Sequence, residues 1–514
     1  MPLSASDPVI IGIGQSVDRI DSQTYTMSSA PDLAAAAARA AVRDAGLGED
    51  ALHRFDAIAT TRTFEDSRPQ PAIFGKSLNF PRSIARRLGM APHYAAWTKA
   101  GGNTPQDLVN EFSERIAAGE FNLVLLAGAE AISTVRSAQA RGVTLDFSED
   151  PGGQVEDRGP GLDEFRDPLM DRHGLGNPTA IYAVAENARR KRLGQTRAAY
   201  AQEMGELFAP FSAVAHRNPR SAWDVPAYSV DELTTVGPHN RWIADPYPLR
   251  LVARDQVNLG AAVLLASRQA AADLGVAADR LVYLRGYARA VEKSVLHRPD
   301  LGASPAAAAV SRLALRHAGV GVEDVDAFDF YSCFPIAVSN VAIDAFGLSP
   351  SEPRGLTVTG GLPYFGGPGN NYSMHAIAEM VERVRKTDGR PGFVGANGGY
   401  LSKYSAGLYS SAPRPWKACD SRALQAELDA VPSPEVLATY EGQGEVESYT
   451  VQHAKDGPGH ATVVGRTANG RRFIARSSAE DRETCLRAHE DDILGAAIDV
   501  TSSSGINSFT FLAA

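Results

Sequence analysis

The chain has 514 residues, of which 44% are hydrophobic and 22% are charged, and its formal net charge at pH 7 is −9. This length exceeds the usual size of one domain, and the composition is typical of a globular protein with roughly two to four domains. The negative charge is spread along the chain, which disfavours nucleic acid as the main partner.

Neither a membrane span nor a secretory leader is predicted from the residues given. No apolar run approaches the length of a membrane-spanning helix, and the N-terminal stretch MPLSASDPVI lacks a charged-then-apolar pattern. Three cysteines, Cys333, Cys419 and Cys485, show no spacing that indicates disulfide pairing. We therefore expect a reducing, cytoplasmic location.

An internal repeat organises the first four fifths of the chain. Residues 35–58 match residues 308–331 without a gap, at a constant offset of 273. Each copy follows a predicted strand (9–16 and 282–291) and leads into another (57–63 and 327–333). Strand, helix and strand in succession favour a parallel sheet with a right-handed crossover. The repeat predicts two similar α/β halves. Since its helices are rich in Ala and apolar on several faces, we expect them to lie between two sheets, in an αβαβα body.

The segment 98–134 contains TKAGGNTPQD and ends in the strand-like LVLLAGAEA. Thr104 is typical of an N-cap, Pro105 of a first helical position, and Asp107 of the positive helix end. Gly101-Gly102 would then precede a helix N-terminus. A cysteine there would have a depressed thiol pKa, with backbone N–H groups nearby to hold an oxyanion.

A second glycine-rich loop, GGLPYFGGPGNN, occupies residues 360–371, between a strand-like LTVT (356–359) and a helix-like segment (372–386). Glycine-rich loops ahead of helices commonly hold anions. This loop contains no Lys, Ser, Thr or acidic residue. Its backbone alone could bind a ligand.

The C-terminal part has a different pattern. A proline-bearing linker is predicted at 413–435, followed by short, turn-rich strands over 436–514 that indicate a small all-β barrel of the OB type. Residues 431–514 carry twelve acidic and seven basic side chains. Because single-strand binding by such a barrel needs a basic groove, a structural or partner-binding role is favoured.

Taken together, residues 6–412 resemble the thiolase superfamily. The segment ending in AGAE (127–130) matches the family's C-x-S-G helix and A-G-G-x-E strand, VNLGAAVLLAS (257–267) its IND-GAA-VL-S stretch, and LGASPAAAAV (301–310) its M-G-x-G-P element. YSCF (331–334), the 360–371 loop and GFVGANGGYLS (392–402) match its N-E-A-F, N-G-G-x-x-x-x-G-H-P and C-x-G-G-G motifs. With its C-terminal barrel, the chain looks most like the bacterial thiolase-like protein type 1 group.

This resemblance implies a duplicated thiolase fold. The N-terminal half would comprise 1–133 and 257–275, a loop domain 134–256, and the C-terminal half 276–412. It also implies coenzyme A or an acyl-CoA as ligand, a role in lipid metabolism, and either a homodimer or a monomer. A protein partner would dock on 436–514. No other cofactor and no metal are expected, because no His, Cys, Asp or Glu spacing suggests a metal site.

The positions that carry thiolase chemistry have changed. A thiolase needs a nucleophilic cysteine, a histidine and a second acid–base group. Those positions fall on Gly102, Gly367, Gly395 and Tyr331 in this chain. Glycine supplies neither nucleophile nor base, so we expect weak or absent thiolase activity. The backbone N–H groups of Gly102 and Asn397 remain candidates for an oxyanion hole.

Other candidate groups are weighed on the same resemblance. His216, Arg217 and Asn258 would contact CoA; the run Arg189, Arg190, Lys191 and Arg192 would do so as phosphate ligands, although a solvated helix face is the favoured interpretation. Cys333 and Tyr331 are the replacement residues that an active acyltransferase would use, with Tyr404 as a further hydrogen-bond donor. His375 is expected to be structural. Three hypotheses follow: an acyl-CoA binder without turnover, an acyltransferase with relocated residues, and a scaffold acting through the barrel.

Overall fold

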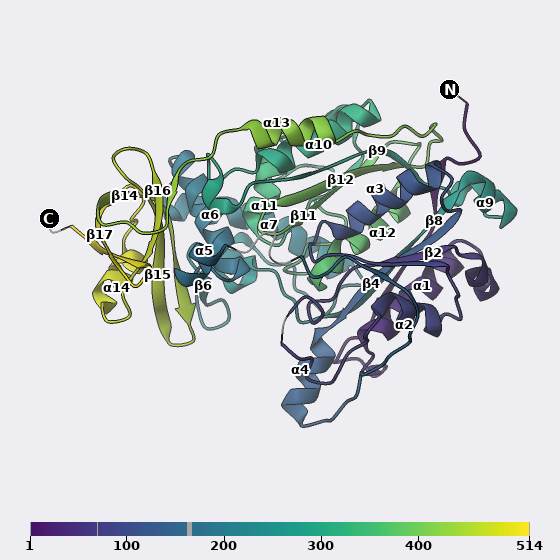
Figure 1. Ribbon diagram of the computed structural model, residues 1–514, viewed down its shortest axis with the longest axis horizontal. Helices are drawn as coiled ribbons and strands as arrows, with labels where there is room; N and C mark the ends of the chain where they lie inside the picture. Colours follow the sequence, from purple (N-terminus) through teal and green to yellow (C-terminus); the bar gives the residue numbers. More distant parts are fainter. Residues whose placement is uncertain (1, 69, 162–166, 513–514) are drawn as a thin grey trace.

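The computed structural model describes residues 2–68, 70–161 and 167–512, and its body consists of five layers (Figure 1). Helices α3 (Thr104–Ala117) and α12 (Tyr372–Val384) pack against each other and contact strands of both sheets. Helix α1 (Ala30–Asp44) covers the outer face of the first sheet, and α10 (Pro305–Ala318) covers the outer face of the second. The predicted αβαβα body is confirmed.

The two sheets repeat one topology. The first has the order β1-β8-β4-β2-β3-β5 and the second the order β10-β11-β12-β9. Reversing the second list aligns β9, β12, β11 and β10 with β1, β8, β4 and β2, in agreement with the sequence repeat. The strands are β1 (Pro8–Val17), β2 (Ala57–Thr60), β3 (Tyr94–Trp97), β4 (Leu123–Ala131), β5 (Glu156–Asp157), β8 (Asn258–Ser267), β9 (Tyr283–Val291), β10 (Ala327–Asp329), β11 (Gly392–Gly398) and β12 (Lys403–Ser410).

The Ala-rich helices of the repeat are outer layers, so their predicted place between two sheets was wrong. A Cβ atom on Gly12 would overlap with the carbonyl oxygen of Ala41 in α1. At the equivalent place in the other half, a Cβ on Gly286 would overlap with the carbonyl oxygen of Ala314 in α10. Glycine in the strand and alanine in the helix together allow this close approach. Composition therefore indicated close packing but not the layer.

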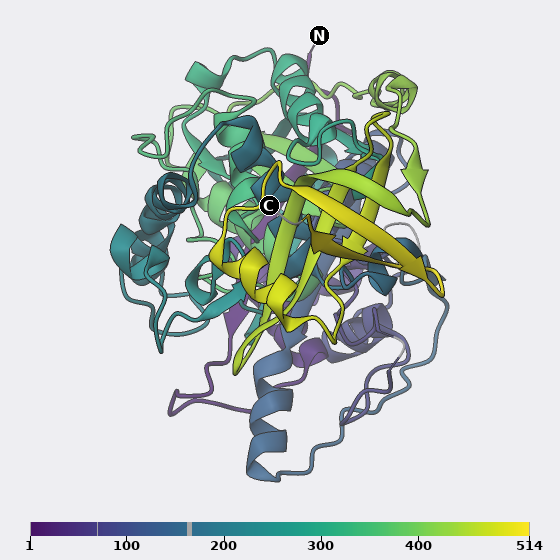
Figure 2. The same cartoon turned by 90° about the vertical axis from the view of Figure 1, so that its left-hand side faces the viewer.

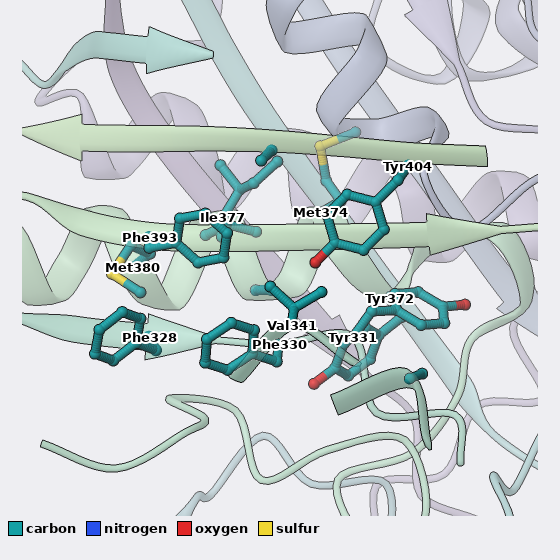
Figure 3. Close-up of a cluster of buried hydrophobic side chains, with 14 of the residues drawn as sticks. Phe328, Phe330, Tyr331, Val341, Tyr372, Met374, Ile377, Met380, Phe393 and Tyr404 are labelled. Atoms are coloured by element: carbon teal, nitrogen blue, oxygen red, sulfur yellow. The ribbon is translucent and has the colours of Figure 1, made fainter. Parts of the chain in front are cut away.

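The central core contains a cluster of aromatic side chains. Phe328 of β10 and Phe393 of β11 contact each other and Phe330, while Met374, Ile377 and Met380 of α12 lie on the same cluster (Figure 3). All of these side chains are buried. Apolar burial on this scale holds the loops that follow β10 and β11 in place.

Two local predictions need correction. LTVT (356–359) is not a strand, because the buried carboxylate of Asp329 accepts hydrogen bonds from the backbone N–H groups of Val358 and Thr359, at 2.9 and 3.1 Å. Burial raises the pKa of this carboxyl to about 6. The N-cap of α3 is Asn103, one residue before the predicted Thr104, whose hydroxyl donates to the carbonyl of Gly101 instead.

The insertion contains helices of its own, and its strands pair with the first sheet and with the C-terminal region. Its elements are α4 (Ile132–Arg141), α5 (Pro168–Arg172), α6 (Pro178–Arg192), α7 (Arg197–Arg217), α8 (Val230–Thr234), β6 (Trp242–Ala244) and β7 (Tyr247–Pro248). Strand β5 pairs with β3 and covers the edge of the first sheet. Strand β6 pairs with a strand of the C-terminal region.

The C-terminal strands form a closed cycle (Figure 2). They are β14 (Gly442–Ala454), β15 (Gly457–Arg466), β16 (Arg472–Arg476), β18 (Ile506–Phe511) and β17 (Ala497–Ser503), each paired with the next and the last with the first. Helix α14 (Arg482–Glu490) follows β16, and α13 (Arg422–Ala430) lies within the expected linker. The all-β nature of this part is confirmed; its assignment to the OB type stays a prediction.

The remaining elements are α2 (Phe80–Arg87), α9 (Arg268–Asp273), α11 (Pro335–Val338) and β13 (Val436–Leu437). Over the described part of the chain, none of the helices is both long and apolar enough to cross a membrane.

Buried charge joins the barrel to the body, and we call this contact the body–barrel interface. Arg190 of α6 is 1% exposed and donates to both carboxylate oxygens of Asp492, at 2.6 and 2.8 Å. Arg472 of β16 is fully buried, pairs with Glu447 at 2.7 Å and donates to carbonyl oxygens of the body, including that of Leu296. Arg189 is buried too and pairs with Asp344. The expectation of a solvated helix face at 189–192 was therefore wrong for Arg189 and Arg190.

A central cluster of glycines and tyrosines

The glycine-rich loop 360–371 is buried along its whole length and packs against protein rather than opening to a ligand. A Cβ on Gly360 would come within 2.5 Å of the Cα of Ala215, and one on Gly361 within 2.7 Å of the Phe211 ring. Both contacts are with α7 of the insertion. Both glycines also have positive φ, 112° and 81°. Their small size and left-handed backbone let the insertion sit directly on the loop.

Gly102 has no room for a side chain. A Cβ there would overlap with the hydroxyl of Tyr331 and lie 2.6 Å from the carbonyl oxygen of Asn397. The group of Asn397 that faces this position is thus an acceptor, which would repel an oxyanion. The hydroxyl of Ser373 donates to the carbonyl of Gly102 at 2.7 Å and fixes the loop against α12.

Gly395 repeats this arrangement. A Cβ on Gly395 would overlap with the hydroxyl of Tyr404, which lies in the next strand. At Gly367 the nearest group is the carbonyl oxygen of Arg254, 3.1 Å from a Cβ. At two of the three glycines, therefore, a tyrosine hydroxyl fills the volume that a side chain would need.

Tyr331, Cys333, Tyr182 and Asn397 lie together beside Gly102, and we call these five residues the central cluster. The side-chain amide of Asn397 donates to the hydroxyl of Tyr182 at 2.7 Å, and its nitrogen is 3.8 Å from Sγ of Cys333. Tyr182 stacks on Phe334 with ring centroids 4.4 Å apart. The cluster unites the insertion with both halves of the body.

The central cluster is electrically neutral. Burial raises the pKa of the Cys333 thiol to about 12, so the thiolate is not formed at physiological pH. Burial also raises the pKa of Tyr182 and Tyr331 above the ordinary value of a phenol. Such groups donate hydrogen bonds; they supply no ready nucleophile and no base.

The structure does not bring the proposed CoA contacts to this place. His216 and Arg217 are exposed at the C-terminal end of α7, where Nδ1 of His216 lies 2.7 Å from the carbonyl oxygen of Val225. Asn258 is buried: its side chain accepts from the Thr134 N–H and donates to the carbonyl of Asp18, both at 2.9 Å. The oxygen and the nitrogen of the Asn258 side chain are therefore both hydrogen-bonded to the backbone.

His375 is buried in α12, two helical residues beyond Ser373. Its Nδ1 lies 2.6 Å from Oε1 of Gln15, and Nε2 is buried without a hydrogen-bond partner. Burial lowers its pKa to about 3, so the ring stays neutral. One ring nitrogen is thus paired, as a structural histidine requires.

A cavity of about 740 Å³ opens next to the central cluster. Asn103 and Thr104 of the α3 N-terminal turn and Tyr404 line it. Its charged lining comprises Lys99, Arg158, Arg289, Lys403 and Arg422 with Asp107, Glu111, Glu114 and Asp420. Among the described residues, no group of three or more His, Cys, Asp or Glu is placed to hold a metal ion.

Sequence reasoning missed Tyr182, the residue that the insertion contributes. Its only signal was a lone tyrosine in the Ala-rich stretch AIYAVAENA, which also contains the fully buried Glu186. A polar or aromatic residue on an otherwise small-residue helix face is a sign of a specific partner, but the partner lay far away in the sequence.

Comparison with known proteins gives two kinds of match. Residues 423–504 match the model of the "thiolase-like protein type 1 additional C-terminal domain". A monomeric SCP2-thiolase-like protein type 1 from Mycobacterium smegmatis is 40% identical, with a TM-score of 0.85, over 99% of this chain and 100% of that one. None of the curated proteins compared with the chain matches it.

Two more distant structures share the fold of the body. The Ltp2–ChsH2(DUF35) aldolase is 20% identical, with a TM-score of 0.56, over 79% of this chain and 98% of that one. An acetyl-CoA acetyltransferase from Syntrophomonas wolfei is 16% identical, with a TM-score of 0.52, over 79% of this chain and 99% of that one.

Proposed function

Because the chain belongs to the SCP2-thiolase-like protein type 1 family, we propose that it binds acyl-CoA thioesters in lipid metabolism without catalysing thiolysis. One observation carries this proposal. The hydroxyl of Tyr331 fills the space of a side chain at position 102, where the thiolase resemblance puts the nucleophile. A neutral hydrogen-bond donor thus replaces a reactive thiolate. Such a donor can hold the carbonyl of a thioester but cannot accept its acyl group.

We propose that the ligand enters through the cavity of about 740 Å³ rather than across the insertion. The insertion side of the glycine-rich loop is covered by α7, whereas this cavity reaches Asn103 and Tyr404 beside the central cluster. Its five basic and four acidic side chains include Asp107, and partial burial raises the pKa of this carboxyl. The lining therefore has a positive balance that suits the phosphates of CoA.

The proposal extends to the oligomeric state. The Mycobacterium smegmatis relative is described as monomeric. In this chain β5 pairs with β3 and removes the free edge that sheet-to-sheet dimerisation would use. We propose a monomer in the cytoplasm.

The test is calorimetric titration with CoA and with acetoacetyl-CoA, with thiolysis followed spectroscopically in the same samples. We expect micromolar binding of both and no turnover. Tyr331→Phe should weaken acetoacetyl-CoA by up to about tenfold, the effect of one hydrogen bond, and leave CoA unchanged. Tyr409→Phe, in the same strand as Tyr404 but outside the cavity lining, is the matched control and should change neither.

Two outcomes would contradict the proposal. Turnover that Cys333→Ala abolishes would make the protein an acyltransferase with relocated residues. Absence of binding would leave a scaffold that acts through residues 436–514.

A further inference from the structure

A second cavity, of about 340 Å³, is lined in part by α4, which lies at the lower edge of the body in Figure 1. Much of its wall is apolar, formed by Phe64, Ile73, Phe80, Ile132, Val135 and Phe147. Ile73 is 59% exposed, an unusual position for an isoleucine that nothing covers. The volume falls within the range of small-molecule sites, ~300–1,000 Å³.

A buried carboxyl group lines this cavity. Glu130, at the end of β4, is 2% exposed and lines the cavity. Its Oε1 accepts a hydrogen bond from the Phe64 N–H at 2.7 Å. Its Oε2 has no hydrogen-bond partner within the described residues. Burial, together with repulsion by Asp66, Glu65 and Asp255, raises the pKa of Glu130 well above its ordinary value. This shift favours the protonated carboxyl, whose O–H can donate to a ligand in the cavity.

The charges around the cavity compensate one another. Lys76 pairs with Asp66 at 3.1 Å, and Arg136 pairs with Asp255 at 3.5 Å. Glu65 is attracted by the third cation, Arg68, and by Lys76. An anionic or cationic ligand would have to break one of these pairs or expose its own charge to an apolar wall.

We propose that this cavity is a second ligand site, which takes a neutral hydrophobic molecule carrying one acceptor oxygen, such as an alcohol or a ketone. The oxygen accepts the hydrogen bond from Glu130. The hydrocarbon part lies against Phe64 and Val135 and covers Ile73. No part of this site is shared with the central cluster or with the larger cavity.

The test uses N-phenyl-1-naphthylamine, a neutral probe whose fluorescence rises in apolar surroundings, with the full-length protein. Octan-1-ol should displace the probe with an inhibition constant at least about tenfold lower than that of octylamine or octanoate. The charged analogues bind more weakly because their charge must leave water. Saturating CoA should not displace it. Probe binding that is absent, that CoA abolishes, or that octylamine or octanoate competes as well as octanol would overturn the proposal.

Matched variants test whether the probe binds in this cavity. Val135→Trp, which fills the cavity from α4, should weaken probe binding at least about tenfold, while Ala140→Trp on the same helix, outside the cavity, should leave it unchanged. Glu130→Gln keeps a donor and should preserve octanol binding, whereas Glu130→Leu should weaken it up to about tenfold. Equal thermal midpoints for the two tryptophan variants exclude a folding effect. Undiminished binding in Val135→Trp contradicts the site.

Discussion

The central cluster and the body–barrel interface differ in where the chain keeps its charge. In the cluster, Gly102 lies against the hydroxyl of Tyr331, and burial raises the pKa of Tyr331 and Cys333, which keeps both groups neutral. At the interface, the guanidinium groups of Arg190 and Arg472 are buried. Each forms an ion pair, Arg190 with Asp492 and Arg472 with Glu447. A buried pair costs much to break although it adds little over an apolar contact. The chain thus uses buried charge to attach a domain, and neutral hydrogen-bonding groups in its central cluster.

The largest expected effect is at the interface. Arg190→Met leaves Asp492 without its partner and should lower the free energy of unfolding by about 3 kcal/mol, near the lower end for a broken buried pair, since Asp492 is partly exposed. Urea denaturation measures it. Lys191→Met, on the same helix with an exposed partner, is the control and should have little effect. Equal stability of the two variants would remove the contrast between buried and exposed charge.

The next effect tests the cluster. Gly102→Cys forces a side chain into the space of the Tyr331 hydroxyl and should cost about 2 kcal/mol, as overpacking does. Adding Tyr331→Phe removes that hydroxyl and should restore part of the loss, which a double-mutant denaturation series measures. The cluster would not be sterically closed if Gly102→Cys were as stable as the wild type and catalysed thiolysis.

A third, smaller effect separates the two proposed entrances for CoA. Arg289→Glu, in the cavity of about 740 Å³, should weaken CoA about tenfold, or ~1.4 kcal/mol. Arg217→Glu, the same change at the exposed end of α7, should leave the affinity unchanged. Titration calorimetry decides, and the reverse ranking would move the ligand to the insertion.

The last predicted effect concerns the pH dependence of stability and is absent at neutral pH. His375 has a folded pKa of about 3, against ~6.5 when unfolded, so the unfolded chain binds more protons between these values. Stability should therefore fall as the pH drops from about 6.5 to about 3. His375→Gln should flatten that decline in denaturation curves. His453→Gln, at the β14 end of the interface, should flatten it less, since its folded pKa is lowered only to about 4. A larger effect at His453 would contradict the prediction.

The architecture could be predicted because it depends on patterns of residues that are close together in the sequence. The constant offset between the two copies, the strands around them and the change to short alternating strands beyond 436 all survive in the fold. Each depends on residues that are close in sequence. The linker was predicted from its prolines, yet it contains α13, whose helical pattern is only nine residues long.

The errors share one physical origin. The basic run at 189–192 looked solvated because the partner of Arg190, Asp492, is 302 residues away. The Ala-rich helices were placed in the wrong layer because small side chains indicate close packing without naming the neighbour. LTVT has the composition of a strand, but the carboxylate of Asp329 takes its N–H groups. The packing of tyrosine hydroxyls against Gly102 and Gly395 could not be predicted either, because it depends on contacts between separate segments of the chain.

The pairing of Ala244 in β6 with Gln452 in β14 has a consequence for protein synthesis. Because a chain leaves the ribosome N-terminus first, β6 emerges about two hundred residues before the strand that completes its sheet. Until then the insertion carries an open strand edge, and Arg190 on α6 lacks its counter-charge. A part of the chain made about two hundred residues later therefore completes the insertion, and a nascent chain stalled before residue 442 holds an unfinished insertion.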